Sequence, residues 1–105
     1  MKLKCIATGS TGNTYALISD TGEILLLDLG VSEKTIKKGI DWKISNVVGA
    51  VISHGHKDHS LSVEDFKSMG IPIYAPYIQY GKLFGLQKFN LQKIMKYLII
   101  ISVLM

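Results

Sequence analysis

The three histidines of the chain lie within six residues of one another, beside an aspartate. They stand at positions 54, 56 and 59 of the segment SHGHKDH (residues 53–59), and the aspartate is residue 58. Imidazole nitrogen and carboxylate oxygen are the ligands that zinc and similar divalent cations take where no thiolate is near. A histidine-rich surface turn, the alternative, is more often a simple run of histidines. We therefore predict that His54, His56, Asp58 and His59 bind a metal ion.

The spacing of these residues fits hydrolytic chemistry. His54 and His56, two positions apart in an extended turn, can direct both rings at one ion, and Gly55 lets the backbone bend between them. Asp58 and His59 project differently because they are adjacent, so they can reach a second ion or orient a water held on the first. A divalent cation lowers the pKa of its bound water toward ~7 and polarises the bond to be cleaved. Asp58 is therefore the candidate catalytic residue as well as a ligand.

The elements around this loop predict that it is firmly held. Residues 47–52 are apolar and predict a buried strand, and the loop follows at the carboxyl end, where open sheets place their ligand crevices. Ser62, with Asp65 three residues later, resembles a capping pair for a helix over residues 63–69. The loop would thus lie between a strand and a helix.

The preceding residues predict an antiparallel meander. Residues 3–7, 15–19 and 23–28 read as strands, separated by a glycine-rich loop and an Asp-Thr-Gly turn. The third is continuously apolar, as expected when both strand faces are covered. Further elements are predicted after it: a helix capped by Ser32 and ending near Gly39, a strand over residues 73–75, and a helix over residues 77–84. Strands that alternate with helices indicate an α/β layered domain.

Three segments resemble the metallo-β-lactamase superfamily. Residues 54–59 match its His-x-His-x-Asp-His signature, and residues 25–30 (LLLDLG) resemble its early strand ending in aspartate and glycine. Residues 9–15 (GSTGNTY) are similar to the Gly-Ser-x-Gly-Asn segment of a bacterial and phage branch that includes proposed exonucleases and phosphodiesterases. The resemblance covers residues 1 to about 75, and the histidine signature is its most specific part.

The resemblance implies an α/β (α+β) fold: half of an αββα sandwich, with a mixed sheet of about five or six strands and helices on one face. It implies one or two zinc ions per site, with Mn²⁺ or Fe²⁺ as alternatives. Positions matching His54 and His56 hold the first ion, and those matching Asp58 and His59 the second. Such sites hydrolyse an ester, an amide or a phosphodiester. Asp28 would support the metal loop by hydrogen bonding, although an aspartate before glycine is also a common turn former, and both interpretations stay open.

Two smaller features have structural interpretations. Residues 9–12 could turn backbone amides toward a phosphate, but they lack the Gly-Lys-Ser/Thr ending of a Walker A loop. A tight turn between strands is the favoured interpretation. Cys5, the single cysteine, is expected in the core because it lies inside a strand. It excludes an internal disulfide, which fits a reducing cytoplasm.

The charge is unevenly distributed. Of the 12 basic residues, all lysines, 5 follow residue 66, where no acid occurs, although the chain carries 8 acids in all. Without arginine, bidentate reading of bases is not expected. A lysine-rich nucleic-acid-binding module is one alternative function, but a solvated lysine face is favoured.

The second half of the family's site has no counterpart here. That half normally supplies another histidine, a bridging aspartate and a final histidine, yet no histidine follows His59 and no acid follows Asp65. We expect residues 1–90 to form the N-terminal half of a metallo-β-lactamase-like domain. Residues 91–105 are expected to be an apolar, aberrant tail from an early stop or a shifted reading frame, with an isolated fragment as the alternative. A homodimer or a second chain would complete the site.

The sequence thus predicts a metal-dependent hydrolase, apparently truncated, that acts on phosphodiesters or nucleic acid. A non-catalytic metal-binding remnant is the second alternative. A cytoplasmic protein without membrane insertion is expected, because no signal peptide is visible and the apolar stretch of residues 97–105 is far shorter than the ~20 residues a membrane-spanning helix needs.

Overall fold

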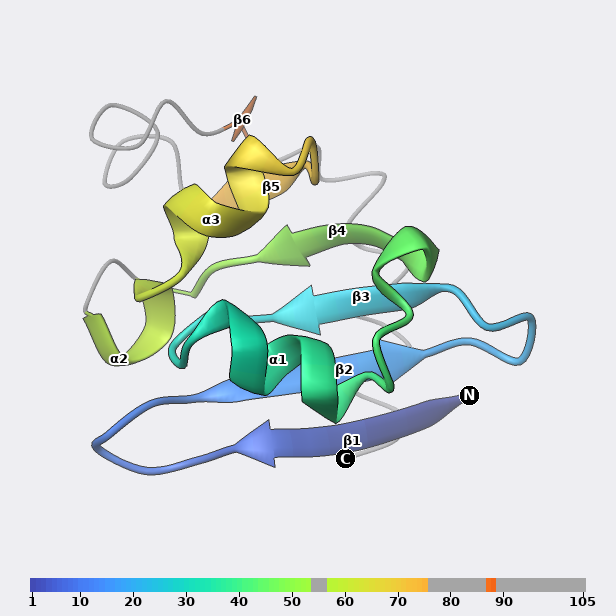
Figure 1. Cartoon of the computed structure of the whole chain (residues 1–105), viewed down its shortest axis with the longest axis horizontal. Helices are drawn as coiled ribbons and strands as arrows, with labels where there is room; N and C mark the ends of the chain where they lie inside the picture. The colour runs from blue at the N-terminus through green and yellow to red at the C-terminus, as the bar shows by residue number, and fades with distance from the viewer. Residues whose placement is uncertain (54–56, 76–86, 89–105) are drawn as a thin grey trace.

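The computed structural model describes residues 1–53, 57–75 and 87–88, which form a mixed β-sheet covered by helices (Figure 1). The sheet has six strands in sequential order: β1 (Lys2–Ala7), β2 (Thr14–Ile18), β3 (Ile24–Leu27), β4 (Val47–Val51), β5 (Ile73–Ala75) and β6 (Gln87–Lys88). The first three strands form the predicted antiparallel meander. From β3 to β6 neighbouring strands run parallel. The expected mixed sheet of five or six strands is confirmed.

The helices lie on one face of the sheet, as predicted. They are α1 (Glu33–Gly39), the 3-10 helix η1 (Ile44–Asn46), α2 (Lys57–Ser60) and α3 (Val63–Ser68). Figure 1 shows α1 in front of the meander and α3 in front of β5, while the short α2 lies at the end of the sheet. The start of α1 is as predicted, because the Thr35 amide donates to Ser32 Oγ at 3.3 Å.

The capping pair predicted for α3 is wrong. The Ser62 side chain makes no capping hydrogen bond to the helix. Its hydroxyl donates instead to the carbonyls of Leu29 at 3.2 Å and Val31 at 2.8 Å. Ser62 is buried at 1% exposure, so its hydroxyl needs a partner in the interior, and the carbonyls after β3 provide two. The residue joins α3 to the segment that follows β3.

The hydrophobic core lies between the sheet and the helices. Phe66 of α3 and Ile36 of α1 are fully buried, each contributing ~1.5–3 kcal/mol by burial. The sheet and the loops supply the other members of the cluster: Ala16, Ile24, Leu26, Leu29, Ile40, Ala50, Ile52, Val63, Ile71 and Ile73. Strand β3 is buried on both faces, since Leu25 is covered as well as its neighbours Ile24 and Leu26. This confirms the interpretation of its continuous apolar sequence.

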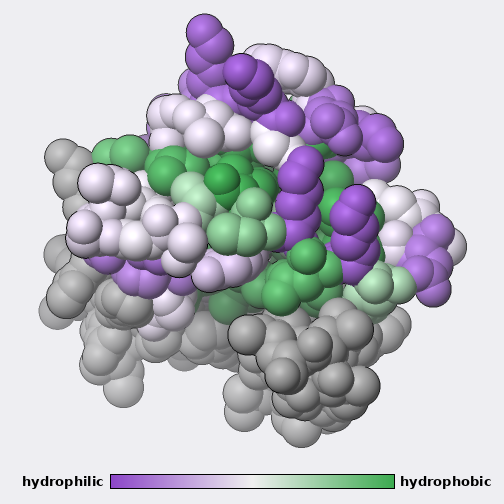
Figure 2. Space-filling model, turned by 90° about the horizontal axis from the view of Figure 1, so that it is seen from below, coloured by the Kyte–Doolittle hydropathy of each residue, from purple (hydrophilic) through white to green (hydrophobic). Residues whose placement is uncertain are grey.

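The edge strand β1 corrects one expectation. Cys5 is exposed rather than buried, because β1 pairs with β2 alone and the alternation of the strand turns Cys5 away from the helix-covered face. Figure 2, which views the molecule from the β1 side, shows apolar side chains at the centre with hydrophilic ones around them. Ile6 packs against the core from this strand. The partly or fully exposed Lys2 and Lys4 disfavour pairing of this edge with another strand.

Several predictions concern residues outside the described part of the chain. These are the ligands His54 and His56, the helix over residues 77–84, the tail of residues 91–105, and the boundary at residue 90 where that tail begins. Within the described residues, none of the helices is long and apolar enough to span a membrane.

Candidate functional site

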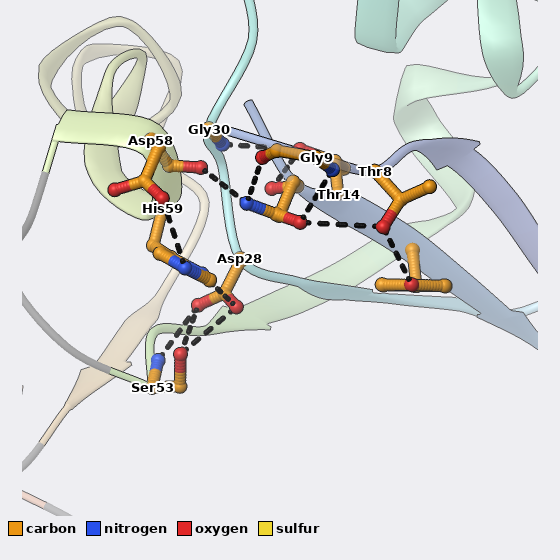
Figure 3. A network of polar contacts seen from close by, with 10 residues as sticks. Thr8, Gly9, Thr14, Asp28, Gly30, Ser53, Asp58 and His59 are labelled. Atoms are coloured by element: carbon orange, nitrogen blue, oxygen red, sulfur yellow. Dashed lines mark hydrogen bonds and ion pairs between the residues drawn. The ribbon is translucent and has the colours of Figure 1, made fainter. Parts of the chain in front are cut away.

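The chemically active side chains meet at the carboxyl ends of the central parallel strands (Figure 3). Asp28 directly follows β3, and Ser53 lies two residues beyond β4. The short helix α2 carries Asp58 and His59 over the same end of the sheet. Because β3 and β4 are parallel neighbours, their carboxyl ends open on one edge, which is where open sheets place ligand sites. The described residues of the loop, Ser53 and Asp58–His59, therefore lie at the predicted end of the sheet.

Asp28 is the centre of this arrangement. Its backbone is left-handed, with φ of 63°, a conformation that aspartate and asparagine tolerate better than most residues. Its carboxylate Oδ1 accepts from the Ser53 amide at 2.7 Å and from Ser53 Oγ at 3.0 Å, and Oδ2 is 2.9 Å from the same hydroxyl. On the other side, Oδ2 lies 2.8 Å from Nδ1 of His59. One carboxylate thus joins the end of β4 to α2.

The contact with Asp28 determines the protonation pattern of the His59 ring. An ionised carboxylate only accepts hydrogen bonds, so Nδ1 beside it must carry the hydrogen. In the neutral ring Nε2 then holds a lone pair, which is the form that ligates metals. A carboxylate that fixes the ring of a ligand histidine in this way is a common second partner in metal sites. Both possible roles of Asp28 are therefore present: it turns the backbone, and it supports the candidate ligand.

The remaining nitrogen of His59 faces a second candidate ligand. Nε2 lies 3.4 Å from Oδ2 of Asp58. A metal ion bound between these two electron-rich atoms would make their approach favourable. Ligands about 2.0–2.2 Å from a tetrahedral ion lie roughly 3.3–3.6 Å apart. The nitrogen and the oxygen therefore fit as two ligands of one cation, and both side chains are partly exposed, at 17% and 33%.

The described residues bring together two of the four predicted ligands. Asp58 and His59 lie side by side, whereas His54 and His56 fall outside the described part of the chain. Among residues 1–53, 57–75 and 87–88, no group of three or more histidine, cysteine, aspartate or glutamate side chains is arranged to hold a metal. The four-ligand site itself stays a prediction.

Two residues near the site were not singled out as functional by the sequence. Ser53 donates to Asp28 through both its amide and its hydroxyl. Asn13 donates its backbone amide to the Asp58 carbonyl at 2.7 Å, although the two are 45 positions apart. The only sequence signal for Asn13 was its place in the Gly-Ser-x-Gly-Asn segment, which was interpreted as a turn. The turn itself is present, since the Gly12 amide donates to the Gly9 carbonyl at 3.3 Å.

A shallow pocket of about 210 Å³ opens beside Asp58. Ser10 and Thr11 of the glycine-rich loop line one part of it, and Gly30 and Leu61 complete the lining. The hydroxyl groups of Ser10 and Thr11 give this pocket hydrogen-bonding capacity next to the candidate ligand pair. A small polar group could therefore be accommodated next to Asp58.

Comparisons with known structures agree with this fold. The BLEG-1 B3 metallo-beta-lactamase superposes with a TM-score of 0.60 at 24% identity, over 70% of this chain and 36% of that chain. The DIM-1 metallo-beta-lactamase gives a TM-score of 0.59 at 16% identity, over 86% of this chain and 53% of that chain. The chemotaxis sensor ODP, in a structure of a peroxy diiron species, gives a TM-score of 0.57 at 19% identity, over 69% of this chain and 32% of that chain. These likenesses establish the fold.

The extent of the match is partial. The chain spans between 32% and 53% of the lengths of these three proteins. The comparison with curated proteins gives no match. A family model described as the metallo-beta-lactamase superfamily matches residues 7–90, which is most of the chain. The chain therefore belongs to the metallo-beta-lactamase superfamily.

Proposed function

We propose that this chain supplies one half of the active site of a metal-dependent hydrolase. His54, His56, Asp58 and His59 are the proposed ligands, and Asp58 is also the proposed catalytic residue. The observation that carries the proposal is the 3.4 Å approach of His59 Nε2 to Asp58 Oδ2, with Nδ1 of the ring held by Asp28. When bound, a divalent cation would polarise the substrate and make water nucleophilic at neutral pH.

The protein's own residues have positioning roles in this proposal. Asp28 keeps the His59 ring in one tautomer and one orientation through the 2.8 Å contact at Nδ1. Ser53 holds the Asp28 carboxylate from the other side. A ligand that is oriented before the metal arrives loses less conformational entropy on binding, which raises the affinity of the site. Asp58, at 33% exposure, is accessible to a substrate or a water molecule.

Zinc is the proposed ion, with Mn²⁺ or Fe²⁺ as alternatives. A set of imidazole and carboxylate ligands without thiolate is typical of catalytic zinc sites. Iron is retained as an alternative because the similar chemotaxis sensor has been described with a peroxy diiron species. The exposed free thiol of Cys5 favours a reducing, cytoplasmic location for the protein.

A phosphodiester, including that of nucleic acid, is the proposed substrate class. The formal net charge of +4 favours anionic substrates. The Gly-Ser-x-Gly-Asn segment is similar to that of a branch with proposed nucleases and phosphodiesterases. The pocket beside Asp58 is lined by the hydroxyl-bearing residues Ser10 and Thr11, which suits a group rich in oxygen atoms.

The 105 residues contain only part of the ligand set that the proposed site needs. His54 and His56 would give the first ion two protein nitrogens, and Asp58 and His59 would bind the second ion. Catalytic zinc usually has three protein ligands. No histidine follows His59 and no acid follows Asp65 in the 105 residues. We propose that a second copy of the chain, or a different chain, supplies the remainder. Activity and association should then appear together.

The experiment that tests the proposal combines metal analysis, mass in solution and hydrolysis of bis(p-nitrophenyl) phosphate. The wild type should retain zinc, and association should accompany hydrolysis. The double variant His54→Ala/His56→Ala should lose most of the zinc, whereas Asp65→Asn, a carboxylate change at an exposed position of α3, should retain it. Zinc held by the double variant at the wild-type stoichiometry would refute the assignment of the loop.

Two other functions have an observation in their favour. A non-catalytic metal-binding remnant is favoured by the missing ligands, and it would bind metal as a monomer and hydrolyse nothing. A lysine-rich nucleic-acid-binding module is favoured by the 5 lysines that follow residue 66 without any acid. Its affinity for nucleic acid would survive chelation of metal and fall steeply with salt. The same purified protein distinguishes all three functions.

A further inference from the structure

Three chain segments meet at Gly30 with no space for a side chain between them. These segments are the glycine-rich loop of residues 8–13, the end of β3, and α2. The Gly30 amide donates to the Asn13 carbonyl at 3.0 Å, and the Asn13 amide donates to the Asp58 carbonyl at 2.7 Å. A Cβ atom on Gly30 would lie 1.8 Å from the Asp58 carbonyl oxygen and 2.5 Å from the Asn13 nitrogen. The glycine is therefore required for this approach of the three backbones.

The Asn13 side chain fastens this junction from the loop side. Its Oδ1 accepts from the Gly9 amide at 3.1 Å, and its Nδ2 donates to the Gly9 carbonyl at 2.8 Å, which closes the loop into a ring. The same Nδ2 also lies 3.3 Å from the Asp58 carbonyl. The Asp58 carbonyl therefore receives two donors from Asn13, one from the backbone and one from the side chain.

These contacts favour the turn interpretation of the loop over a phosphate cradle. A phosphate cradle needs backbone amides that point at the ligand. The amides of Gly9, Gly12 and Asn13 donate instead to Asn13 Oδ1, to the Gly9 carbonyl and to the Asp58 carbonyl. Three amides of this loop are thus engaged within the protein. These three amides bind other parts of the chain rather than an anion.

The part that Asn13 holds is the turn that carries the candidate ligands. Helix α2 has only four residues, Lys57–Ser60, so helix propagation alone cannot stabilise it. External bonds fix its backbone: Asn13 holds the Asp58 carbonyl, and the Leu29 amide donates to the His59 carbonyl at 2.8 Å. The direction of both side chains follows from the placement of this backbone. A displacement of about 1 Å is enough to impair such a site.

We infer that Asn13 is a positioning residue for the metal-binding turn, and that the Gly9–Gly12 loop clamps α2 through it. The inference rests on the proposed function, and it assigns a positioning role to Asn13, the last residue of the Gly-Ser-x-Gly-Asn segment. Asn13 itself touches neither metal nor substrate in this role. It acts through the carbonyl of Asp58.

The test compares two variants of Asn13 with a matched asparagine elsewhere. Asn13→Ala removes all its side-chain bonds, whereas Asn13→Asp keeps the acceptor for the Gly9 amide and removes the Nδ2 donor to the Gly9 and Asp58 carbonyls. Asn46→Ala is the control, since Asn46 Nδ2 donates to the Gly22 carbonyl at 3.1 Å and likewise joins two segments. If the alanine variant fails to fold, the aspartate variant still tests the clamp.

Two readouts separate positioning from simple stability. In metal-free protein, amide hydrogen exchange in α2 should accelerate in both Asn13 variants and stay unchanged in Asn46→Ala. With Co²⁺ as the probe, both Asn13 variants should bind about tenfold more weakly and with an altered visible spectrum, while Asn46→Ala retains the wild-type spectrum despite a similar loss of thermal stability.

Unchanged exchange in α2, or wild-type Co²⁺ affinity and spectrum in both Asn13 variants, would overturn the inference. That outcome is distinct from failure of the proposed function, in which the wild type itself takes up no Co²⁺. In that case the role in a metal site is overturned for Asn13 as well, and the exchange result alone reports whether the loop clamps α2.

Discussion

Replacement of Asp28 by asparagine changes one oxygen of the carboxylate and little else. Asparagine has the same size and tolerates the left-handed backbone, with φ of 63°, about as well as aspartate. The Ser53 amide and hydroxyl donate to Oδ1 at 2.7 and 3.0 Å. The variant's amide oxygen will therefore face Ser53, and its NH₂ group will take the position that faces Nδ1 of His59.

This reversal should move the hydrogen of the His59 ring. An NH₂ group donates, so Nδ1 must now accept, and the hydrogen of the neutral ring moves to Nε2. Nε2 is the atom that lies 3.4 Å from Asp58 Oδ2 and is proposed to bind the metal. Loss of such a supporting carboxylate typically weakens metal binding 10- to 100-fold, which is about 1.4–2.7 kcal/mol.

The same change should have a smaller effect on the metal-free fold. A hydrogen bond to a charged group contributes about 1.5–3 kcal/mol, against about 0.5–1.5 kcal/mol for a neutral pair. Asp28 and His59 are only 14% and 17% exposed, so solvent screens the charged bond little. We expect Asp28→Asn to destabilise the apoprotein by about 1 kcal/mol, less than its effect on metal binding.

The assay is competition for zinc with a chromophoric chelator, together with urea unfolding of the protein in EDTA. Asp65→Asn, the same chemical change at an exposed residue of α3, should leave both measurements at their wild-type values. Nitrogen chemical shifts of the His59 ring report which nitrogen carries the hydrogen. The reasoning is refuted if Asp28→Asn binds zinc with wild-type affinity, or if its ring keeps the hydrogen on Nδ1.

Two further predictions concern packing. Gly30→Ala places a methyl group 1.8 Å from the Asp58 carbonyl oxygen, and should lower the free energy of unfolding by about 3 kcal/mol, the upper end for overpacking. Urea unfolding measures this loss. The control Ser45→Ala, at an exposed site, should stay within about 0.5 kcal/mol of the wild type. Phe66→Ala empties the centre of the core, where Phe66 is fully buried, and should cost about 3–5 kcal/mol. Met69→Ala, at 37% exposure beyond the same helix, should cost much less, and equal losses for the two would contradict the described core.

The strands could be predicted because their signals are local. Apolar runs between turn residues placed β3 within one residue of its observed span, Ile24–Leu27. The short helix Glu33–Gly39 could be predicted equally well, because its N-cap, Ser32, directly precedes it in the sequence. Propensity, turn chemistry and capping all act over a few residues, so these signals can be recognised in a single sequence.

Predictions failed where a distant partner decides the outcome. Ser62 has the sequence context of a helix cap, yet its hydroxyl donates to carbonyls that lie after β3. Cys5 has the context of a core residue, but β1 is an edge strand and leaves it exposed. Strand order and the partners of a buried hydroxyl depend on the whole fold, and the residues next to Ser62 and Cys5 do not specify them.

The same distinction between local signals and distant partners applies to the candidate site. Candidate ligands could be proposed from the sequence because residue type and spacing indicate coordination chemistry. The interactions that orient the ligands join residues 28 and 59, or 13 and 58, and these pairs are 31 and 45 positions apart. No local pattern pairs Asp28 with Nδ1 of His59 or Asn13 with the carbonyl of Asp58.

The arrangement also explains how a chain that spans only part of the length of similar proteins can contain an ordered part of a site. Helix α2 is held by Asn13 and by Leu29 through its carbonyls, and by Asp28 through the His59 ring. All three partners belong to the first 30 residues of the chain, so no bond in this set depends on a second domain half. A partner chain would therefore have to bring ligands, but it would not have to create the geometry of Asp58 and His59. Preorganisation of one ligand pair lowers the entropic cost of completing the site, which favours the association that the proposed function requires.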